Sequence, residues 1–290
     1  MQSGSSRSYT AEGVTALRAV GARERDPKLR NPDHLAEQFL TWPLRTRVRW
    51  APLRVASVAV IERLLPGLYR FVTARTKHID SVLVDELGSG AVRQLFILGA
   101  GADSRPYRFR ERLDGVRVFE LDHPATSAWK QQQTRKLFGQ LPAHVRYVPI
   151  NFDSQPLATA LDEAGADRNT PSLFIWEGVT PYLTEQAVTA TLREISRFAT
   201  GSSVLFDYFY HDAIHDPTRH VDAPKFHSYL GRRGEPLTFG IEPDQMAAYL
   251  ATHGLTLASH AYPADLADRH LGGAHQVLPF SAIVHARTAG

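Results

Sequence analysis

The chain has 290 residues, of which 43% are apolar and 22% are charged, as expected for one globular domain with or without a lid. Cysteine is absent, which excludes disulfides, thiolate catalysis and thiolate metal sites. No apolar run approaches the roughly 20 residues of a membrane span, and the N-terminus lacks the hydrophobic core of a secretion signal. We therefore expect a cytoplasmic protein without a membrane partner.

The net charge of +3 is unevenly distributed along the chain. Residues 1–80 contain 14 Lys and Arg against 7 Asp and Glu, whereas the remaining 210 residues contain 19 against 23. The arginines are dispersed and no nucleic-acid-binding motif accompanies them, so we expect no nucleic-acid partner. Two interpretations stay open, solvated helix faces or a basic lid that attracts an acidic substrate. The sequence does not indicate an oligomeric state.

Residues 1–90 are expected to form a helical cap or lid that precedes the main domain. Thr10 is a suitable N-cap, and Val14, Leu17 and Val20 follow it at helical spacing. Because proline interrupts helices, the rest of the segment is predicted to consist of short helices. The prolines stand at positions 27, 32, 43, 52 and 66.

From residue 94 the pattern changes to short β-branched or aromatic runs that alternate with amphipathic stretches. The predicted strands are Gln94–Leu98, Val116–Leu121, Val145–Ile150, Ser172–Trp176, Ser203–Tyr208, Leu255–His260 and Pro279–Ala286. Strands separated by helix-length intervals indicate βαβ units, so residues 91–290 are predicted to form a doubly wound, mostly parallel α/β sheet of seven strands. Residues 211–240, rich in His, Pro and Gly, are expected to form an inserted loop or lid.

The first predicted strand is followed by Gly99, Ala100 and Gly101, where two glycines permit a tight turn and let a ligand approach bare backbone. In a doubly wound fold this turn lies at the carboxyl edge of the sheet, where ligands bind. A purely structural turn would use the same residues. A dinucleotide fingerprint would have a third glycine or alanine where this chain has Ser104, which weakens a nicotinamide-dependent oxidoreductase as an alternative.

The second predicted strand ends in acidic residues. Glu120 and Asp122 have the parity that points side chains to one face of a strand, and Asp122 lies nearer the carboxyl edge. A carboxylate about 20 residues after the glycines is suited to bind ribose hydroxyls, because it accepts two hydrogen bonds. Asp122, followed by His123, is therefore the candidate ribose contact of a cofactor. An ordinary strand-terminating aspartate is the alternative.

Together these motifs resemble the leucine carboxyl methyltransferase family, especially its bacterial branch of small-molecule O-methyltransferases. The resemblance spans roughly residues 8–285. It is carried by TAEGVTALRAVGARERDP, FILGAGADSRPYRF, VFELDHPATSAWK, YVPINFD and SLFIWEGVTPYLTEQAV, in family order. It implies a class I methyltransferase fold with an N-terminal helical cap, and S-adenosylmethionine as the methyl donor.

The same resemblance implies roles for individual residues toward S-adenosylmethionine. Arg75, in TARTKHID, would contact the cofactor carboxylate, and Glu177, in WEGV, would bind its amino group. A surface or interdomain ion pair is the alternative role for these two residues. The loop of Gly99, Ala100 and Gly101 would pass beneath the methionine portion. The other implied cofactor residues are Asp122 and His123 at the ribose, and Asn151 and Phe152 beside the adenine.

Asn151 and Phe152 depart from the family pattern, which usually has Asp-Leu at these positions. An aspartate accepts a hydrogen bond from adenine N6. The carbonyl of an asparagine accepts in the same way, and its amide donates to N1. We therefore expect the substitution to be tolerated, although Asn151 is the least typical of the implied cofactor residues.

The nature of the methyl acceptor decides whether a general base is needed. A carboxylate, with a pKa of about 4, is already ionised at neutral pH, whereas a phenol, with a pKa near 10, benefits from a base. By the resemblance, Tyr182 would lie close to the methyl-transfer site. His211, just after a predicted strand, is the candidate base for a hydroxyl acceptor, with a non-catalytic loop histidine as the alternative. The basic segment 1–80 and the family's chemistry favour a carboxylate of a small molecule, such as a secondary metabolite.

Three other functions are weighed against methyl transfer. His211 and His215 are four residues apart and could share a metal, but Asp216-Pro217 interrupts a helix there, so no metal site is predicted. An NAD-dependent oxidoreductase leaves WEGVTPYL without a role, and Tyr182 and Lys130 do not form a Tyr-x-x-x-Lys motif. A non-catalytic relative that binds S-adenosylmethionine is excluded by no feature of the sequence.

Overall fold

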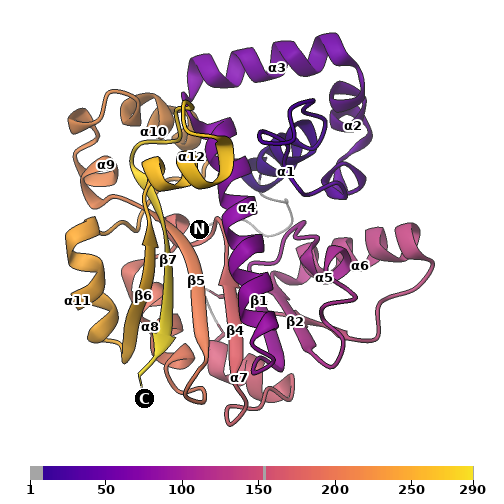
Figure 1. Ribbon diagram of the computed structural model, residues 1–290, viewed down its shortest axis with the longest axis vertical. Helices are drawn as coiled ribbons and strands as arrows, with labels where there is room; N and C mark the ends of the chain where they lie inside the picture. The colour runs from indigo at the N-terminus through magenta and orange to yellow at the C-terminus, as the bar shows by residue number, and fades with distance from the viewer. Residues whose placement is uncertain (1–8, 153–154, 290) are drawn as a thin grey trace.

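The computed structural model describes residues 9–152 and 155–289 and arranges them as a central sheet covered by helices, with a helical cap at one edge (Figure 1). The cap and its connection to the sheet are formed by α1 (Tyr9–Gly21), the 3-10 helix η1 (Ala36–Phe39), α2 (Trp42–Arg49), α3 (Ala51–Leu64) and α4 (Leu68–Gly88). Pro43 and Pro52 occupy the first turns of α2 and α3, where a missing N–H costs nothing. The prediction of short helices is wrong for α4, which runs for 21 residues.

The seven predicted strands are all present. They are β1 (Gln94–Leu98), β2 (Arg117–Asp122), β3 (Val145–Pro149), β4 (Ser172–Trp176), β5 (Ser203–Phe209), β6 (Leu255–Ala261) and β7 (Ser281–Thr288). The order across the sheet is β3-β2-β1-β4-β5-β7-β6, and β7 alone runs antiparallel to its neighbours β5 and β6. The expected doubly wound, mostly parallel sheet is therefore confirmed.

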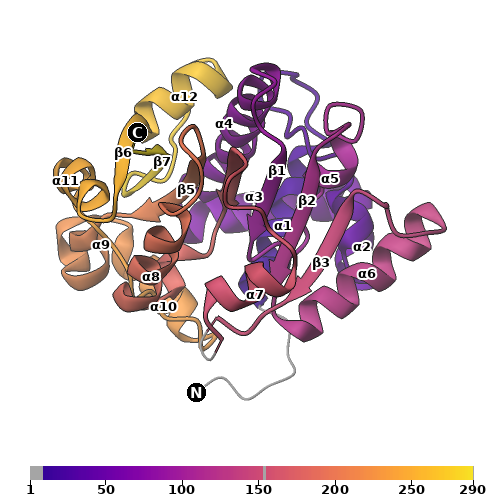
Figure 2. The ribbon, with the colours of Figure 1, turned by 90° about the horizontal axis from the view of Figure 1, so that it is seen from below.

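The other helices connect the strands, and Figure 2 shows them distributed around the sheet. They are α5 (Arg105–Arg108), α6 (Pro124–Phe138), α7 (Leu157–Glu163), η2 (Thr180–Tyr182), α8 (Glu185–Ile195), α9 (His211–His215), η3 (Pro217–Arg219), α10 (Ala223–Gly231), η4 (Pro243–Gln245), α11 (Met246–Ala251) and α12 (Pro263–Leu271). Among the described residues, no helix combines the length and the apolar character needed to cross a membrane.

The segment 211–240 is more ordered than the expected loop, because it contains α9, η3 and α10. Ile214 of α9 and Phe226 and Leu230 of α10 are buried in the core. Its apolar residues are few, yet they recur at spacings that let two short helices cover the sheet. The backbone then returns over η2, where the N–H of Thr238 donates to the carbonyl of Pro181 at 2.7 Å.

Alternating side chains of the strands build one core on each face of the sheet. One core contains Ile97 of β1 together with buried residues of α4, α10 and α12, and the other contains Phe96 with residues of α7, α8 and α11. Phe96 is in register with Phe119 and Phe174, and the rings stack with centroids 4.7 and 4.6 Å apart. This row of stacked rings fixes the register of the three central strands, because a shift by one residue would turn each ring to the other face.

A group of histidines joins α4 to α12 and β7. Nδ1 of His78 lies 3.1 Å from Nε2 of His270, and His285 lines the same cavity of about 290 Å³. Burial lowers the pKa of each of these histidines to about 4, and neighbouring cations such as Arg287 beside His285 add to the effect. All three rings are therefore neutral at pH 7.

We predict that these histidines make the protein sensitive to mild acid. Their pKa in the folded protein lies below the unfolded value of about 6.5, so the unfolded chain binds more protons as the pH falls. Stability is fully present above pH 6.5 and is lost as the pH falls toward 4, by up to about 1.4 kcal/mol per pH unit for each histidine. Urea unfolding at pH 7.5 and 5.0 should show a smaller loss for His285→Gln than for the wild type. The exposed His34, changed to Gln, serves as the control and should leave the loss unaltered.

Candidate functional site

The carboxyl ends of the parallel strands meet at the edge of the sheet that faces the cap (Figure 1). Gly99 follows β1, Asp122 ends β2 and Glu177 follows β4. Because the strands are adjacent and parallel, residues from three motifs of the sequence gather at one edge. Helix α4 connects the cap to this region and contributes Arg75.

Arg75 places its buried guanidinium between two carboxylates. Its Nε lies 3.0 Å from Oε1 of Glu177, and its Nη1 donates a hydrogen bond of 2.5 Å to Oδ2 of Asp207 at the end of β5. The Nε contact lacks hydrogen-bond geometry, and this buried donor has no hydrogen-bond partner among the described residues. Arg75 and Glu177, which the resemblance assigned to opposite charges of the cofactor, are thus in direct contact with each other.

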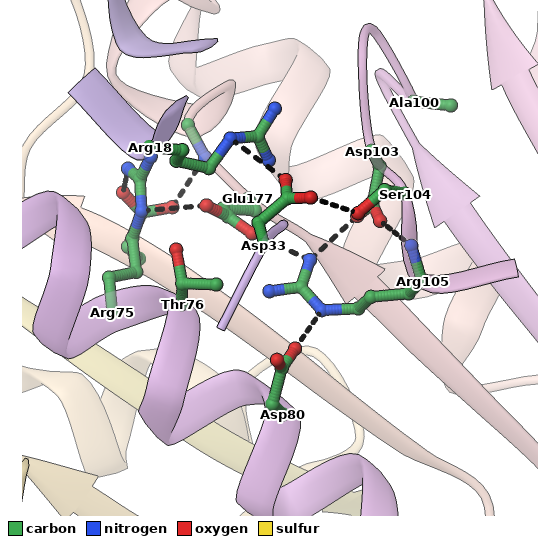
Figure 3. A network of polar contacts seen from close by, with 12 residues as sticks. Arg18, Asp33, Arg75, Thr76, Asp80, Ala100, Asp103, Ser104, Arg105 and Glu177 are labelled. Carbon is green, nitrogen blue, oxygen red and sulfur yellow. Dashed lines mark hydrogen bonds and ion pairs between the residues drawn. The ribbon is translucent and has the colours of Figure 1, made fainter. Parts of the chain in front are cut away.

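Arg105 is a second buried cation at the site. Its Nη1 donates to Asp103 at 2.6 Å and to Glu177 at 2.7 Å, and its Nε donates to Asp80 of α4 at 2.7 Å (Figure 3). Glu177 therefore lies between two arginines. Burial opposes its ionisation, but the charges of Arg105 and Arg75 outweigh burial and hold the pKa of Glu177 well below its usual range.

The cap contributes charges to the same cluster. Arg18 of α1 donates to the carbonyl of Ala102 at 3.1 Å, and its Nε lies 3.5 Å from Oδ2 of Asp33. The hydroxyl of Ser104 donates to Asp33 at 2.5 Å, so the cap is bound to the loop after β1. We call the whole set the arginine–carboxylate network; its members are Arg18, Arg75, Arg105, Arg108, Asp33, Asp80, Asp103, Glu177 and Asp207. With four cations and five anions it carries a formal charge of −1.

The glycines after β1 have different reasons to be glycine. Gly99 has a φ of +66°, and a Cβ at this position would lie 2.4 Å from Cγ2 of Val179. Gly101 has a φ of +43°, and among the residues that the structure describes its Cβ would meet within 4 Å only the carbonyl oxygen of Gly99, at 3.7 Å. A side chain at position 99 would therefore clash with the loop after β4. The space beside Gly101 instead suits a ligand that approaches the backbone. Ala100 between them is buried.

Asp122 is half-buried and fixes the same loop. Its Oδ2 accepts from the N–H of Gly101 at 2.5 Å and its Oδ1 from the N–H of His123 at 2.6 Å. Burial raises the pKa of Asp122, although both hydrogen bonds act in the opposite direction. Each oxygen retains a further lone pair for a hydroxyl group. His123 is exposed and caps α6 by accepting from Ala125 at 3.3 Å.

Glu120 lies two residues before Asp122 on β2, but its carboxylate forms an ion pair with Lys130. Its carboxylate lies 2.6 Å from Nζ of Lys130, and both side chains are buried. Burial raises the pKa of Glu120 to about 7, against the attraction of the Lys130 charge. Glu120 is thus paired with a buried cation, whereas Asp122 as the ribose contact stays a prediction.

Asn151 and Phe152 follow β3, next to the strand that ends in Asp122. Both are half-buried, and Phe152 packs against the core on the Phe96 side of the sheet. The carbonyl of Asn151 accepts from the N–H of Gln155 at 2.8 Å. The last residue of the YVPINFD motif, Asp153, lies outside the described residues.

Tyr182, in η2, lies at the Arg75 end of the site. Burial raises the pKa of its phenol, and the charge of Glu235 adds to the increase, while Arg75 opposes it. Glu235 is itself buried and accepts from the N–H of Thr10 at 3.2 Å, at the start of α1. The segment after α10 and the first turn of α1 therefore meet beside Tyr182.

His211 lies apart from this group. It is exposed at the start of α9, and its ring contacts that of His215 in a tilted arrangement with centroids 4.3 Å apart. Nearby, His220 contacts Asp212 at 2.7 Å and His227 contacts the carbonyl of Ala213 at 3.0 Å. In residues 9–152 and 155–289, no three His, Asp or Glu side chains are arranged to hold a metal ion. The role of His211 as a base remains a prediction.

Sequence reasoning missed several charged residues of the site. Asp103 and Arg105 directly follow the glycine loop, and Asp80 lies five residues after Arg75, so their positions within the motifs were a usable signal. Asp207 lies within the predicted strand Ser203–Tyr208, and no role was predicted for it. Arg18 and Asp33 gave no signal, because the loop residues that they contact, Ala102 and Ser104, lie far away in the chain.

Comparison with known proteins gives consistent results. A family model described as leucine carboxyl methyltransferase matches residues 11–196. A Bacillus subtilis protein, provisionally named an S-adenosyl-L-methionine-dependent methyltransferase, is 29% identical over 196 residues, which is 67% of this chain and 64% of that protein. A Streptomyces coelicolor protein with the same provisional name is 31% identical over 268 residues, 89% of this chain and 86% of that protein. The chain thus matches slightly less than two thirds of the Bacillus protein.

The fold is shared with a solved structure. A provisionally named methyltransferase from Thermobifida fusca superposes with a TM-score of 0.62 and covers 96% of this chain and 94% of its own, at 13% sequence identity. At this identity the likeness concerns the fold alone. The sheet order, the helices on both faces and the covering cap are those of the class I methyltransferase fold.

We predict that Gly99→Ala destabilises the protein by roughly 2–4 kcal/mol, because it combines left-handed backbone strain with a clash against Val179. Gly139→Ala is the matched control. Gly139 has a φ of +78°, but a Cβ added there would meet no atom of the described part of the chain within 4 Å, so only the strain of about 1 kcal/mol remains. The additional change Val179→Ala should recover part of the loss at Gly99. Equal losses for the two glycines in chemical denaturation would show that packing is unimportant.

Proposed function

Because the chain belongs to the leucine carboxyl methyltransferase family, we propose that it transfers a methyl group from S-adenosylmethionine to a carboxylate oxygen of a small molecule. The observation that carries this proposal is the buried pair of Arg75 and Glu177 at the carboxyl edge of the sheet. An amino acid group carries one positive and one negative charge, and this pair offers the complementary charges side by side.

The arginine side of the pair supports a carboxylate ligand. Nε of Arg75 and Nη2 of Arg105 are both buried, and neither has a hydrogen-bond partner among the described residues. Buried donors are normally satisfied, so both atoms favour an acceptor group that completes the site. In the proposed complex, Arg75 keeps Asp207 and turns its Nε to the cofactor carboxylate, while Glu177 keeps Arg105 and accepts from the cofactor ammonium.

The total charge of the site also fits the cofactor. S-adenosylmethionine carries a carboxylate, an ammonium and a sulfonium, so its net charge is positive. The arginine–carboxylate network has a formal charge of −1, and Asp122 adds a further negative charge beside Gly101. Opposite charge at a partly enclosed site favours binding.

Asp122, Asn151 and Phe152 form the nucleoside end of the proposed site. Each carboxylate oxygen of Asp122 already accepts one backbone N–H, from Gly101 or from His123. The remaining lone pairs accept hydrogen bonds from the ribose hydroxyls. Asn151 and Phe152 lie at the end of the neighbouring strand and flank the adenine. The cap, through Arg18 and Asp33, covers the loop between the two ends of the site and excludes water from it.

In the bound state the cofactor supplies a methyl group already activated by its sulfonium, so the protein has to provide alignment and exclusion of water. Held by Arg75, Glu177 and Asp122, the cofactor would supply this methyl group to one oxygen of the acceptor carboxylate. Tyr182 keeps its proton because burial raises its pKa. Its hydroxyl therefore orients the acceptor by donating to the carboxylate oxygen that does not attack.

The occupied or neutral state of the side chains in and beside the arginine–carboxylate network supports a carboxylate acceptor. Asp207 is occupied by Arg75 and by the N–H of Gly178 at 2.6 Å, and the pKa of Glu177 is held low by two arginines. Tyr182 is a donor, and His211 is exposed and apart from the network. A carboxylate needs no base, because it is ionised at neutral pH.

One observation favours a second candidate, methylation of a hydroxyl group. Glu235 is buried next to Tyr182 and holds the start of α1 through Thr10. A carboxylate in this position could remove the proton of a phenol. If the acceptor is a phenol, Glu235 is a better placed base than His211, because it lies on the Tyr182 side of the network.

We predict that Glu177→Gln weakens binding of S-adenosylmethionine by about 1–3 kcal/mol, the value of a hydrogen bond to a charged group, as measured by calorimetric titration. Glu194→Gln is a close control, since Glu194 is also buried and also contacts two arginines, Arg168 at 2.5 Å and Arg197 at 3.0 Å. It should leave the affinity unchanged. Equal affinities of wild type and Glu177→Gln would remove Glu177 from the site, and binding of NAD instead of S-adenosylmethionine would refute the proposed function.

A panel of carboxylic acids and phenols tests the acceptor. For a carboxylate acceptor, we predict product methyl esters, a kcat that is flat between pH 6 and 8, and less than a twofold effect of Glu235→Gln on kcat. For a phenol acceptor, kcat would rise with pH and Glu235→Gln would lower it by about 10²–10⁴-fold, the usual contribution of a general base. Turnover of phenols without any turnover of acids would contradict the carboxylate proposal.

A further inference from the structure

The outermost helix of the cap presents an apolar face to solvent. None of the 14 residues of α3, all of which the structure describes, is buried. Its exposed residues recur at helical spacing along one side, and all but one of them are apolar. They are Ala51, Pro52, Leu53, Val55, Ala56, Ala59, Val60, Arg63 and Leu64. Val55 and Val60 are 67% and 54% exposed.

Helix α3 packs only with its inner side. Val58 and Ile61 cover the small core of the cap, together with residues of α1 and α4. Figure 1 shows α3 along the outer edge of the cap, remote from the strands. A continuous apolar stripe in such a position indicates an interaction surface, because isolated apolar side chains are common on protein surfaces but contiguous patches are not.

The surroundings of this stripe are aromatic and basic. Trp42 and Trp50, at the start of α2 and between α2 and α3, are 78% and 58% exposed. Residues 42–64 contain five arginines and one acidic residue, Glu62. Arg47 and Arg63 are exposed, whereas Arg49 is held by Glu37 at 2.6 Å. Exposed tryptophan, an apolar helix face and surplus arginine are the features of a segment that lies in a membrane interface.

We propose that α2 and α3 dock the protein on an anionic lipid surface. The apolar face of α3 enters the headgroup region, while the arginines meet the lipid phosphates. A second copy of the same face is disfavoured as the partner, because pairing would set the arginines of the two copies against each other. This proposal departs from the expectation of no membrane partner, which rested on the absence of a spanning segment; a helix that lies in the interface needs no such segment. This inference goes beyond the proposed function and does not depend on it.

Co-sedimentation with vesicles tests the proposal. The probes are vesicles of pure phosphatidylcholine and of phosphatidylcholine with 30% phosphatidylglycerol, at low and at physiological salt. The wild type should bind the anionic vesicles, more weakly as salt increases, and should bind the neutral vesicles at least tenfold more weakly. Arg47→Gln and Arg63→Gln should each weaken binding by about fivefold, as expected for loss of one basic residue at such a surface.

The double variant Val55→Asp, Val60→Asp should abolish vesicle binding. Val221→Asp is the matched control, because Val221 is 90% exposed and lies outside the cap, and it should bind like the wild type. Titration with S-adenosylmethionine and thermal unfolding show that the variants are folded. As a second signal, the emission of wild-type tryptophan should shift to shorter wavelength with anionic vesicles, and Trp42→Phe with Trp50→Phe should remove the shift.

Two results would overturn the proposal. The first is no binding of the wild type to anionic vesicles at low salt. The second is a dimer in sedimentation equilibrium that Val55→Asp dissociates, which would assign the apolar face of α3 to contact between copies. Neither result would affect the proposed methyl transfer, which is measured with soluble acceptors and cofactor titration.

Discussion

The structure depends on the burial of many charges at one edge of the sheet. Four arginines and five carboxylates are removed from water there, and burying such groups is favourable only if each finds a partner. Loss of one member of a buried pair typically costs about 3–5 kcal/mol, because the other is left uncompensated. Since the members come from the cap, from α4, from the segments after β1 and β4 and from β5 itself, the network requires these elements to be in place together.

The strands were predictable because each is a short apolar run between polar or glycine-rich segments. β1 and β4 match their predicted bounds, while the predicted final strand begins two residues early, at Pro279, because the run of apolar residues starts before the pairing does. Parallel order then places Gly99, Asp122 and Glu177 at one edge without further information. Which charges pair was not predictable in this way. Arg105 could pair with any acidic residue that the fold brings near, and only the packing of α4 identifies Asp80.

The arginines of residues 1–80 occupy two different environments, a buried network and the outer surface of the cap. The composition of the segment does not distinguish them. Arg18 and Arg75 turn inward and belong to the network, where carboxylates neutralise them. Arg47 of α2 and Arg63 of α3 are exposed on the outer side of the cap, whereas Arg49 is paired with Glu37. Because carboxylates neutralise the inward arginines, the interpretation as a basic lid that attracts an acidic substrate stays a prediction. The cap therefore has an inner surface whose charges belong to the network, and an outer surface with exposed apolar and basic side chains.

The position of β7 has a consequence for how the chain matures. β7 is the last of the seven strands to be synthesised, yet it lies between β5 and β6 rather than at an edge. During translation, β5 and β6 are therefore present with a missing neighbour between them, and their unpaired edges are exposed until β7 arrives. Chaperone contact and premature aggregation should concentrate in this interval. A ribosome that pauses within the β7 codons would lengthen the interval, whereas a pause just after β4 would leave the four strands β1 to β4 already able to pair with one another.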